Sequence, residues 1–468
     1  MAINVSFRRY YDSMKFLLKI LICLISTVPF AACIEDGVTT SPSDQPVFST
    51  DTLRIGEVFT GEVTPTFRFT VYNPAGKSIM VSNISLSGPD AALLHINVDG
   101  ISGTTFSDVE IRGKDSVFVF VEARIPEDDG LRRKCEASVD FTTNGVKSSL
   151  PVKATGINAV RLRAQTITDN TCFDSPKPYI IYDSLVVAPG AGLTLGAGTR
   201  LCFHDKASLV VRGTLRSEGT SEAPVAMAGD RTGNVVGNIS FDIMSRQWSG
   251  VVFASGSTDN VLSHTVIRNT VGGVRAEESS LSMTNCRLTN SGGVGFEAIN
   301  STVEAAGCEF SEASAGLVSL DGGRATFAQC TFANNYLFTV VTEPAIRFAQ
   351  NEYEVFTPEA TFSNSIIYGL GPDLSHGELT GAQIYFRHCL FRSKGTDDDN
   401  FIGCVWDTDP LYYTVRNEYL FDYRLREGSP AIGVGDATLN PPAAAADFYG
   451  VQRGETPDLG AYVYQAPE

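Results

Sequence analysis

Three cysteines recur at one fixed interval in the second half of the chain. Cys286, Cys308 and Cys330 are 22 residues apart, in the contexts NCRL, GCEF and QCTF. Such a series could form disulfides, bind a metal, or fill one stacking position of a structural repeat. A zinc site is disfavoured because the spacing lacks C-x-x-C pairs and nearby histidines. Disulfides between stacked neighbours would be strained. A buried column of small side chains is therefore the favoured interpretation, with a disulfide as the main alternative.

The densest group of possible metal ligands is the acidic run TDDDN at residues 396–400, with Asp407 and Asp409 nearby. Hard oxygen ligands at close spacing could bind calcium. The run lacks the alternating ligands and fixed glycine of an EF-hand loop, so a solvated insertion loop is favoured. We assign no metal site to it.

The histidines offer no recognisable catalytic pattern. Each is expected to be an exposed or hydrogen-bonded polar residue, and the sequence contains no nucleophile-elbow, P-loop or dinucleotide motif. We therefore assign no catalytic residue and expect no cofactor. Aromatic residues gather near the acidic run and are expected to be core or end-cap residues rather than a sugar platform. The histidines are His95, His204, His264, His376 and His388.

The element that must position these residues is a repeat of short strands. Besides the cysteines, three apolar columns keep the 22-residue period: Leu281/Val303/Ala325, Met283/Ala305/Phe327 and Leu288/Phe310/Phe332. Self-similarity at this period predicts a solenoid, in which matching side chains stack coil upon coil. Two residues beyond the last column, the positions Asn269, Asn290, Glu312 and Asn334 are expected to mark a corner, because asparagine tolerates left-handed backbone conformations.

Two segments resemble right-handed parallel β-helices of the pectate-lyase-like superfamily. The run YIIYDSLVVAPGAGLTLGAGTRLCFHDKASLVVRGTLRSEGTSEAPVAMAGD, from Tyr179 to Asp230, resembles their opening coils, and residues 407–464 resemble the terminal segment of bacterial β-helix proteins. In that segment Asp447, Arg453 and Asp458 are expected to be turn and pairing residues. The family includes polysaccharide lyases and hydrolases, but their marks N-T-D, G-H-G and R-I-K are missing from this sequence.

Residues 47–156 alternate apolar and polar side chains in about seven short bursts, which fits an immunoglobulin-like sandwich. The phrase FRFTVYNPAGKSIMVSNISLSG resembles the Hydin-like modules of that type. Such modules usually serve as spacers or docking units.

The N-terminus has the form of an export signal. From Met14, the expected true start, a basic region and a short apolar run lead to Phe30-Ala31-Ala32-Cys33. This ending resembles the lipobox of bacterial lipoproteins, especially those of Bacteroidetes, in which the cysteine is acylated and becomes the mature N-terminus. An ordinary signal peptide cut near Ala32 is the alternative. The polar stretch that follows reads as a flexible tether, and Glu35 and Asp36 resemble a surface-export signal.

The formal net charge of −17 argues against a nucleic-acid partner, which requires basic patches. The sequence thus predicts an all-β, outer-membrane lipoprotein, placed at the cell surface of a Gram-negative bacterium and held in lipid through acylated Cys33. The expected function is non-catalytic presentation of a β-helix surface to a polysaccharide or envelope protein. A polysaccharide lyase or glycoside hydrolase with an atypical site is the alternative. The expected segments are signal peptide 1–32, tether 33–46, Ig-like sandwich 47–156, β-helix 157–430 and C-terminal cap 431–468.

Overall fold

A computed structural model describes residues 37–236, 239–417 and 419–466. Strands dominate this part of the chain, and its only helical segments are four short 3-10 turns. None of the described helices is long and apolar enough to cross a bilayer. The predicted all-β fold class is confirmed. The 3-10 turns are η1 (Ala91–Leu93), η2 (Phe241–Ile243), η3 (Ala437–Leu439) and η4 (Pro442–Ala444).

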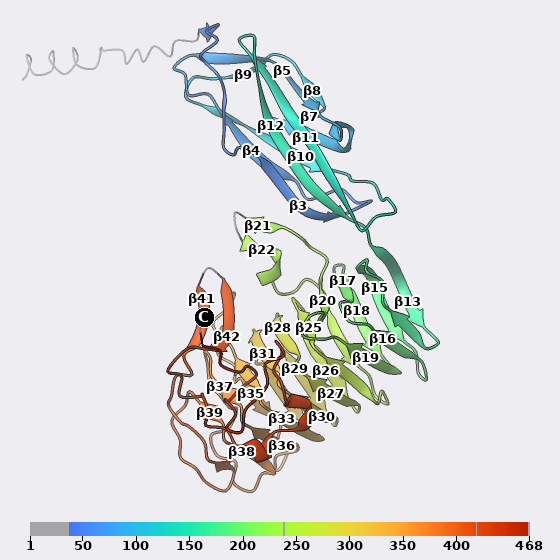
Figure 1. The fold of residues 1–468 in the computed structure, drawn as a ribbon, viewed down its shortest axis with the longest axis vertical. Helices are drawn as coiled ribbons and strands as arrows, with labels where there is room; N and C mark the ends of the chain where they lie inside the picture. Colours follow the sequence, from blue (N-terminus) through green and yellow to red (C-terminus); the bar gives the residue numbers. More distant parts are fainter. Residues whose placement is uncertain (1–36, 237–238, 418, 467–468) are drawn as a thin grey trace, which may run out of the picture. The chain divides into compact units, whose positions relative to one another are not determined.

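The chain divides into two compact units, and each is described by itself. Unit 1 holds most of the strands that precede residue 152. Unit 2 begins continuously at Lys153 and also takes in Arg54–Thr64 and Arg124–Cys135. Figure 1 shows the ribbon and labels many of its strands.

The N-terminal strands form two sheets that make a β-sandwich. One sheet has the order β1-β5-β11-β12-β3, with β8 and β9 paired to β5, and the other has the order β2-β4-β10-β6-β7. Phe48 of one sheet packs on Phe141 of the other, with ring centroids 4.9 Å apart. The Ig-like identity of the sandwich remains a prediction. The first sheet consists of β1 (Val38–Thr39), β3 (Leu53–Phe59), β5 (Ser78–Ser87), β8 (Thr105–Phe106), β9 (Val109–Ile111), β11 (Arg132–Thr143) and β12 (Val146–Ile157). The second consists of β2 (Val47–Phe48), β4 (Phe67–Tyr72), β6 (Leu94–Val98), β7 (Ile101–Gly103) and β10 (Ser116–Ala123).

Unit 2 winds through three stacks of parallel strands, here called sheets 1, 2 and 3. From β18 (Ser208–Val211) to β37 (Ile366–Ile367) the chain visits them in that order once per coil, and the later coils add strands to sheets 2 and 3 alone. Sheets 1 and 3 are joined at the first coils by β15 (Tyr179–Val187), which pairs with both β17 and β18 and also with β13 (Val160–Ile167). Sheet 1 contains β18 (Ser208–Val211), β23 (Gly250–Phe253), β26 (Val274–Glu277), β29 (Phe296–Ile299), β32 (Val318–Asp321) and β35 (Ile346–Phe348).

Sheet 2 contains β14 (Thr171–Phe173), β16 (Gly192–Leu195), β19 (Thr214–Glu218), β24 (Asn260–Ser263), β27 (Ser280–Thr284), β30 (Thr302–Ala306), β33 (Arg324–Ala328), β36 (Glu359–Ser363), β38 (Ile384–Arg387) and β40 (Phe401–Ile402). Sheet 3 contains β17 (Arg200–Phe203), β20 (Val225–Gly229), β25 (Thr265–Arg268), β28 (Arg287–Ser291), β31 (Glu309–Ala313), β34 (Thr331–Ala333), β37 (Ile366–Ile367) and β39 (Leu390–Phe391). Two hairpins lie outside the sheets: β21 (Asn234–Val236) with β22 (Ile239–Ser240), and β41 (Tyr412–Asn417) with β42 (Leu420–Leu425).

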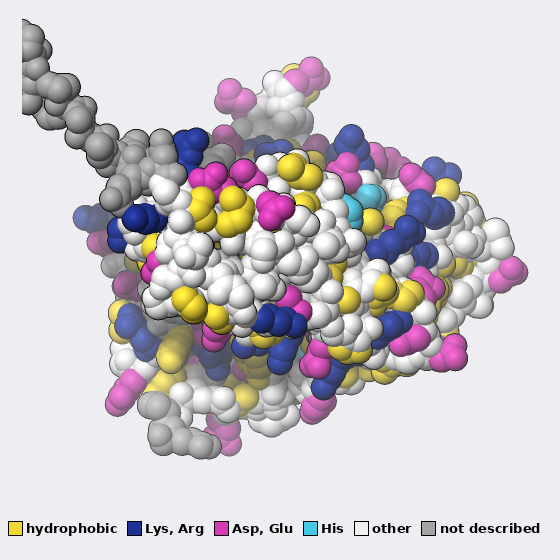
Figure 2. Space-filling view, turned by 90° about the horizontal axis from the view of Figure 1, so that it is seen from above, with side chains coloured by type: hydrophobic (Ala, Val, Ile, Leu, Met, Phe, Trp, Pro, Cys, Tyr) yellow, Lys and Arg dark blue, Asp and Glu magenta, His cyan; other side chains and the backbone are white. Residues whose placement is uncertain are grey.

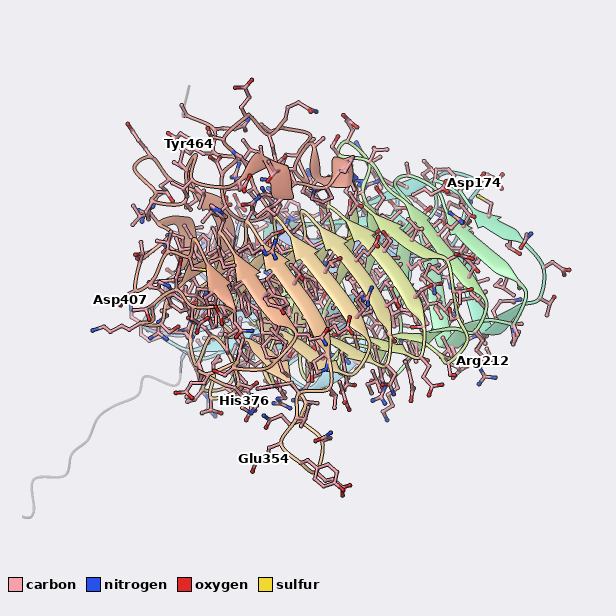
Figure 3. The ribbon with its side chains drawn as sticks, turned by 90° about the horizontal axis from the view of Figure 1, so that it is seen from below. Asp174, Arg212, Glu354, His376, Asp407 and Tyr464 are labelled. Atoms are coloured by element: carbon pink, nitrogen blue, oxygen red, sulfur yellow. The ribbon has the colours of Figure 1, made fainter. Side chains whose placement is uncertain are left out.

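The predicted columns are vertical neighbours in the stack, which Figure 3 shows from below. Met283 pairs with Ala305, and Ala305 pairs with Phe327, in successive strands of sheet 2. The same column then becomes a stack of nearly parallel rings, because parallel in-register strands place equivalent side chains about 4.8 Å apart. Ring centroids in that stack are separated by 4.9 Å for Phe327–Phe362, 4.6 Å for Phe362–Phe386 and 5.2 Å for Phe386–Phe401.

The cysteine column is a ladder of buried free thiols, which confirms the predicted stacking role. Cys286, Cys308 and Cys330 are fully buried, and none of the three forms a disulfide. The Cys308 thiol donates to the carbonyl oxygen of Ala306 at 3.4 Å. Burial raises the pKa of the Cys308 thiol well above its ordinary value, so it stays protonated and unreactive. The disulfide alternative is wrong for these cysteines. In later coils the thiols of Cys389 and Cys404 likewise donate to the carbonyl oxygen two residues earlier, at 3.5 and 3.8 Å.

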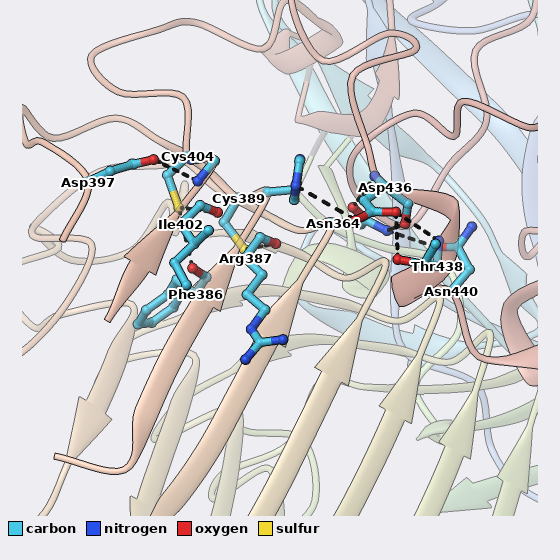
Figure 4. A network of polar contacts seen from close by, with 12 residues as sticks. Asn364, Phe386, Arg387, Cys389, Asp397, Ile402, Cys404, Asp436, Thr438 and Asn440 are labelled. Carbon is cyan, nitrogen blue, oxygen red and sulfur yellow. Dashed lines mark hydrogen bonds and ion pairs between the residues drawn. The ribbon is translucent and has the colours of Figure 1, made fainter. Parts of the chain in front are cut away.

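Corner residues between sheets 2 and 3 hold the C-terminal segment in place. Asn364, at a backbone φ of 47°, donates to the Asp436 carbonyl at 2.8 Å and accepts from the Asp436 N–H at 2.9 Å (Figure 4). Gln329 donates to the Asn440 side chain at 2.5 Å, and Asn285 donates to the Ala446 carbonyl at 3.2 Å. The left-handed corners thus turn polar side chains outward, where they bind the returning chain.

The corner column that the sequence predicted is largely confirmed. Asn269, Asn290 and Glu312 have φ values of 67°, 59° and 48°. Asn334 does not share this conformation, because the chain leaves the coil there and the Asn334 side chain instead bonds both backbone groups of Ala313, at 2.8 and 3.2 Å.

Candidate carboxylate pocket

The outer face of sheet 3 carries a row of side chains that are apolar, then charged, then polar and uncharged along the stack. Val266, Arg287, Glu309 and Thr331 occupy equivalent positions in successive strands. The pleat turns these side chains away from the interior column that holds Phe310. Charged groups therefore lie in the middle of this row, outside the coil.

Apolar residues of the hairpin β41–β42 and of the C-terminal segment cover the far end of this face. They form one cluster with the outward side chains of the last strands, so these charged groups are shielded from solvent. The buried members of the cluster are Ala333, Ile366, Leu390, Tyr412, Tyr423, Leu425, Ala431, Phe448, Leu459, Ala461 and Tyr462.

Two carboxylates lie under this cover, and each is bound by several groups. Glu309 is 2% exposed and lies 3.3 Å from the Arg287 guanidinium. It also accepts hydrogen bonds from the hydroxyls of Ser311, at 2.6 Å, and Tyr462. Each donor compensates part of the cost of burying the charge.

Glu312 is the second carboxylate and stands in the asparagine corner column. It is 5% exposed and accepts hydrogen bonds from Thr289, at 3.0 Å, and from the Tyr423 hydroxyl. Burial raises the pKa of Glu312 to about 7, and the nearby Glu309 charge adds to the shift. Burial also raises the pKa of Tyr423 well above its ordinary value, so this phenol remains a donor.

Coulomb attraction to Glu309 raises the pKa of Arg287, so this guanidinium stays charged. An arginine-bound carboxylate thus neighbours a carboxyl group that exchanges its proton near neutrality. Such a pair can perform acid–base chemistry or can serve as a buried, pH-dependent anchor.

A pocket of about 400 Å³ opens beside these groups. Its floor comprises Arg287, Glu309 and Glu312, and its rim includes the Arg268–Asp242 ion pair at 3.0 Å. The η2 turn brings Asp242 to the rim, and Asn269 fixes that turn by donating to the Asp242 carbonyl at 2.7 Å. Aromatic and aliphatic side chains complete the wall: Tyr336, Leu337, Phe338, Tyr419, Leu420 and Phe421.

Several wall residues are exposed although they are large and apolar. Phe338 is 42% exposed, Tyr419 45% and Leu420 61%. Polar and charged groups below an apolar rim are a usual composition for a ligand site.

The other candidates from the sequence have structural roles. Asp397 of the acidic run accepts from the N–H groups of Gly403 and Cys404 and from the Trp406 indole, at 2.6 to 3.3 Å, and Asp398 caps the following turn. The described residues contain no group of three or more potential metal ligands. The run is therefore an exposed loop, as the sequence predicted, and these hydrogen bonds shape its turn.

The histidines do not converge on one site. His204 pairs with Asp230 at 2.6 Å, His376 contacts Ser375 at 2.8 Å, and His388 lies 3.9 Å from Asp436. His264 contacts Asn285, and burial lowers its pKa, while His95 is exposed in β6. Cys33, the predicted lipid attachment residue, lies outside the described residues.

The C-terminal acids act in turns, as predicted. Asp447 accepts from the backbone N–H groups of Tyr449 and Val451, both at 2.9 Å. Asp458 accepts from those of Gly433 and Tyr464, at 2.8 and 2.7 Å. Arg453 donates to the Ala461 carbonyl at 2.8 Å.

Sequence reasoning missed the carboxylate pair, although its members lie in the stretch GCEFSEA that includes the repeated cysteine. The available signal was two glutamates in a repeat otherwise built from small and apolar residues. Their proximity to the tail tyrosines depends on segments more than 100 residues away, which a local pattern does not encode.

The fold and this pocket define a class: a parallel β-helix protein with a shielded carboxylate pair beside an apolar-rimmed pocket. Residues 245–417 match the family model described as the right-handed β-helix region. No curated protein matches the chain.

Three solved structures that match this chain are remote from it. A protein of unknown function from Porphyromonas gingivalis W83 is 14% identical, with 27% of this chain and 50% of that one covered at a TM-score of 0.18. A family 123 glycoside hydrolase from Clostridium perfringens, solved to study glycolipid glycan hydrolysis, is 9% identical. The match covers 24% of this chain and 26% of that one, at a TM-score of 0.18. The catalytic domain of a GH87 α-1,3-glucanase in complex with nigerose is 8% identical. The match covers 79% of this chain and 93% of that one, again at a TM-score of 0.18. TM-scores this low transfer no activity to this chain.

Proposed function

We propose that the protein is a lipid-anchored cell-envelope protein whose β-helix binds a glycan in the pocket between sheet 3 and β42. Aromatic faces stack on sugar rings, while carboxylates, arginines and amides bond sugar hydroxyls. The observation that supports this proposal is the combination, in one pocket, of the exposed rim at Phe338 and Leu420 with the paired charges of the floor. Lys and Arg are interspersed with Asp and Glu on the face that Figure 2 shows.

Binding is favoured over catalysis because the carboxylates of the pocket are already engaged. Glu309 is bound by Arg287 and two hydroxyls, and Glu312 by two hydroxyls. Groups held in this way form a rigid floor for a ligand.

A glycan array probed with the purified mature chain tests the proposal. Phe338→Ala should weaken binding about tenfold, the usual effect of removing one well-packed contact of ~1.4 kcal/mol. The matched control is Tyr353→Ala, which removes an aromatic side chain that is 77% exposed and lies outside the pocket. If Phe338→Ala and the unchanged chain bind the glycan with equal affinity, the pocket is not the binding site. If the chain binds an envelope protein but no glycan, the ligand is a protein and the proposed ligand class is wrong.

Membrane attachment has its own test. Cys33→Ser should release the protein from the membrane fraction and abolish palmitate labelling, because two or more acyl chains are needed for durable anchoring. Retention and labelling that survive this substitution would remove the lipid anchor from the proposal.

Hydrolysis or lyase cleavage of a polysaccharide is the second candidate function. It is favoured by one observation, the raised pKa of Glu312 beside the arginine-bound Glu309. Reducing-sugar release from glycans found on the array would indicate cleavage, and Glu312→Gln should then abolish release while binding persists. Binding without release would leave the protein a binding protein.

A further inference from the structure

The strand β42 contributes both a wall of the pocket and a direct contact to its floor. Its residues Leu420 and Phe421 line the pocket, and Tyr423, two residues further along, donates to Glu312. Within the described strands β41 and β42 pair only with each other. Their position against sheet 3 therefore depends on side chains rather than on a backbone ladder.

The side chains that hold β42 in place are few. Tyr423 is 2% exposed and also accepts from the Asn335 amide at 3.2 Å, while Tyr412 and Leu425 pack in the apolar cluster. The Tyr423–Glu312 contact is thus a polar link between the wall and the coil at the centre of a mostly apolar interface.

We propose that the protonation state of Glu312 controls how firmly β42 packs on sheet 3, so that the pocket is formed best in mildly acidic conditions. When Glu312 loses its proton, a second negative charge appears beside Glu309 under the buried interface. Water can hydrate that charge fully only if β42 loosens, because the packed pocket leaves just 5% of Glu312 exposed. Ionisation of Glu312 and packing of β42 therefore oppose each other. This inference rests on the proposed function of the pocket and adds its regulation.

The direction of the pH dependence follows from linkage. Glu312 has a pKa of about 7 when β42 is packed, against an ordinary value of 4.5 when hydrated. The packed state therefore holds the extra proton, and its advantage is complete below pH 4.5 and is lost as the pH rises to about 7.

Besides Glu309, several charged and titratable groups face Glu312 from the elements packed around it. On sheet 3, Arg287 stays charged because Glu309 raises its pKa. Burial raises the pKa of Tyr412 and Tyr423 on the hairpin and of Tyr462 on the C-terminal segment, so the phenols stay neutral. The η2 turn contributes Asp242, which is paired with Arg268.

Hydrogen exchange on the full mature chain tests the proposal without a ligand. After correction for intrinsic rates, the amide protection of residues 412–417 and 420–425 should fall about tenfold from pH 6 to pH 8, the largest change that one proton with a pKa of about 7 can produce over this range. Protection of β29 and β32, on sheet 1, should stay constant. Glu312→Gln should abolish the fall, because glutamine cannot ionise. If the fall persists in Glu312→Gln, or is missing in the unchanged chain, the proposal is wrong.

A second variant keeps the test valid if Glu312→Gln does not fold. Glu312→Asn installs the residue found at the equivalent corners Asn269 and Asn290, which suits the left-handed backbone. It should likewise give protection that is independent of pH. Glu304→Gln, at an exposed glutamate of β30, is the matched control and should keep the pH dependence.

Ligand binding separates this inference from the proposed function. A glycan from the array should bind at least threefold more weakly at pH 8 than at pH 6, and equally at both in Glu312→Gln. If no glycan binds but the exchange result holds, the proposed function fails and the pH-dependent packing stands. If a glycan binds equally at both pH values and exchange is constant, the regulation fails and the function stands.

Discussion

The thiol column shows that one position in the coil accepts several small side chains for the same geometric reason. Thr265 and Ser365 occupy this position in other coils, and their hydroxyls donate to the carbonyl two residues earlier at 2.9 and 2.8 Å. The thiol of Cys308 makes the equivalent contact. The position therefore requires a small side chain with a donor and an acceptor, not sulfur chemistry.

Cys308→Ser should accordingly cost no more than about 1 kcal/mol of stability, because the new hydroxyl finds the same carbonyl. Cys308→Val should cost about 1–3 kcal/mol, since valine leaves the Cys286 N–H without its 3.4 Å acceptor and crowds the core. Urea denaturation checks both. Cys172→Ser, at an exposed cysteine, is the control and should change nothing. A serine variant as unstable as the valine variant would contradict this account.

A second residue-scale prediction concerns the tail tyrosine. Tyr462→Phe removes the phenol that donates to buried Glu309 and should destabilise the protein by about 1–3 kcal/mol, the usual cost of a lost hydrogen bond to a charge. Thermal unfolding measures the change. Tyr449→Phe is the matched control, because Tyr449 is 47% exposed and its hydroxyl makes no hydrogen bond in the described structure. Equal shifts for both variants would mean that the Glu309 contact contributes nothing.

Residue identities predicted the interior far better than the outer face. The columns through Met283 and Cys308 follow from a fixed period, since each inward side chain meets only its equivalents in adjacent coils. Glu312 shares its position with asparagines, so the sequence marks it as a corner. Its partners come from Tyr423 and Thr289, and no local rule selects a residue 111 positions away.

At the scale of elements, the corners between sheets 2 and 3 are what attach the C-terminal segment. Asn364 combines a positive φ with three side-chain hydrogen bonds to residues 436 and 440. Asn300 has a similar φ of 46° but no side-chain hydrogen bond in the described structure. Alanine substitutions at these two positions therefore separate two losses of stability: the strain of a left-handed backbone, which both share, and the lost hydrogen bonds to the C-terminal segment, which only Asn364 makes.

Asn364→Ala should lower stability by about 2–4 kcal/mol, and Asn300→Ala by only about 1 kcal/mol, the strain of an alanine in the left-handed region. Limited proteolysis should cut the segment 436–446 faster in Asn364→Ala alone. Similar proteolysis in both variants would show that the corner bonds do not hold the segment.

The elements themselves differ in how visible they are in the sequence. The coils from residue 265 to 333 follow the 22-residue period closely, and their strands pair in register. Longer insertions between β34 and β38 obscure the later coils, among them the loop that projects at Glu354 in Figure 3. The sequence pattern does not reveal the hairpin β41–β42, because its packing surface is the outer face of other strands.

At the scale of the whole molecule, a coil stack has an outer face that is ordinarily polar, and here part of it is apolar. Ile366 and Leu390 of sheet 3 point outward and are buried by the hairpin and the C-terminal segment. The hairpin β41–β42 and the C-terminal segment, together called the tail, therefore form a second layer packed on the β-helix.

Ending the chain after residue 410 tests this view. The truncation removes Tyr412, Tyr423 and Tyr462, aromatic side chains that bury ~150–250 Å² each, and uncovers the apolar outer face. The truncated protein should aggregate and bind a hydrophobic dye. Adding Ile366→Thr and Leu390→Thr, which copy the outward Thr331, should restore a soluble coil stack, measured by sedimentation and circular dichroism. A truncated chain that stays monomeric without these changes would show that the tail is dispensable, and one that the threonines do not rescue would show that the tail supplies more than cover.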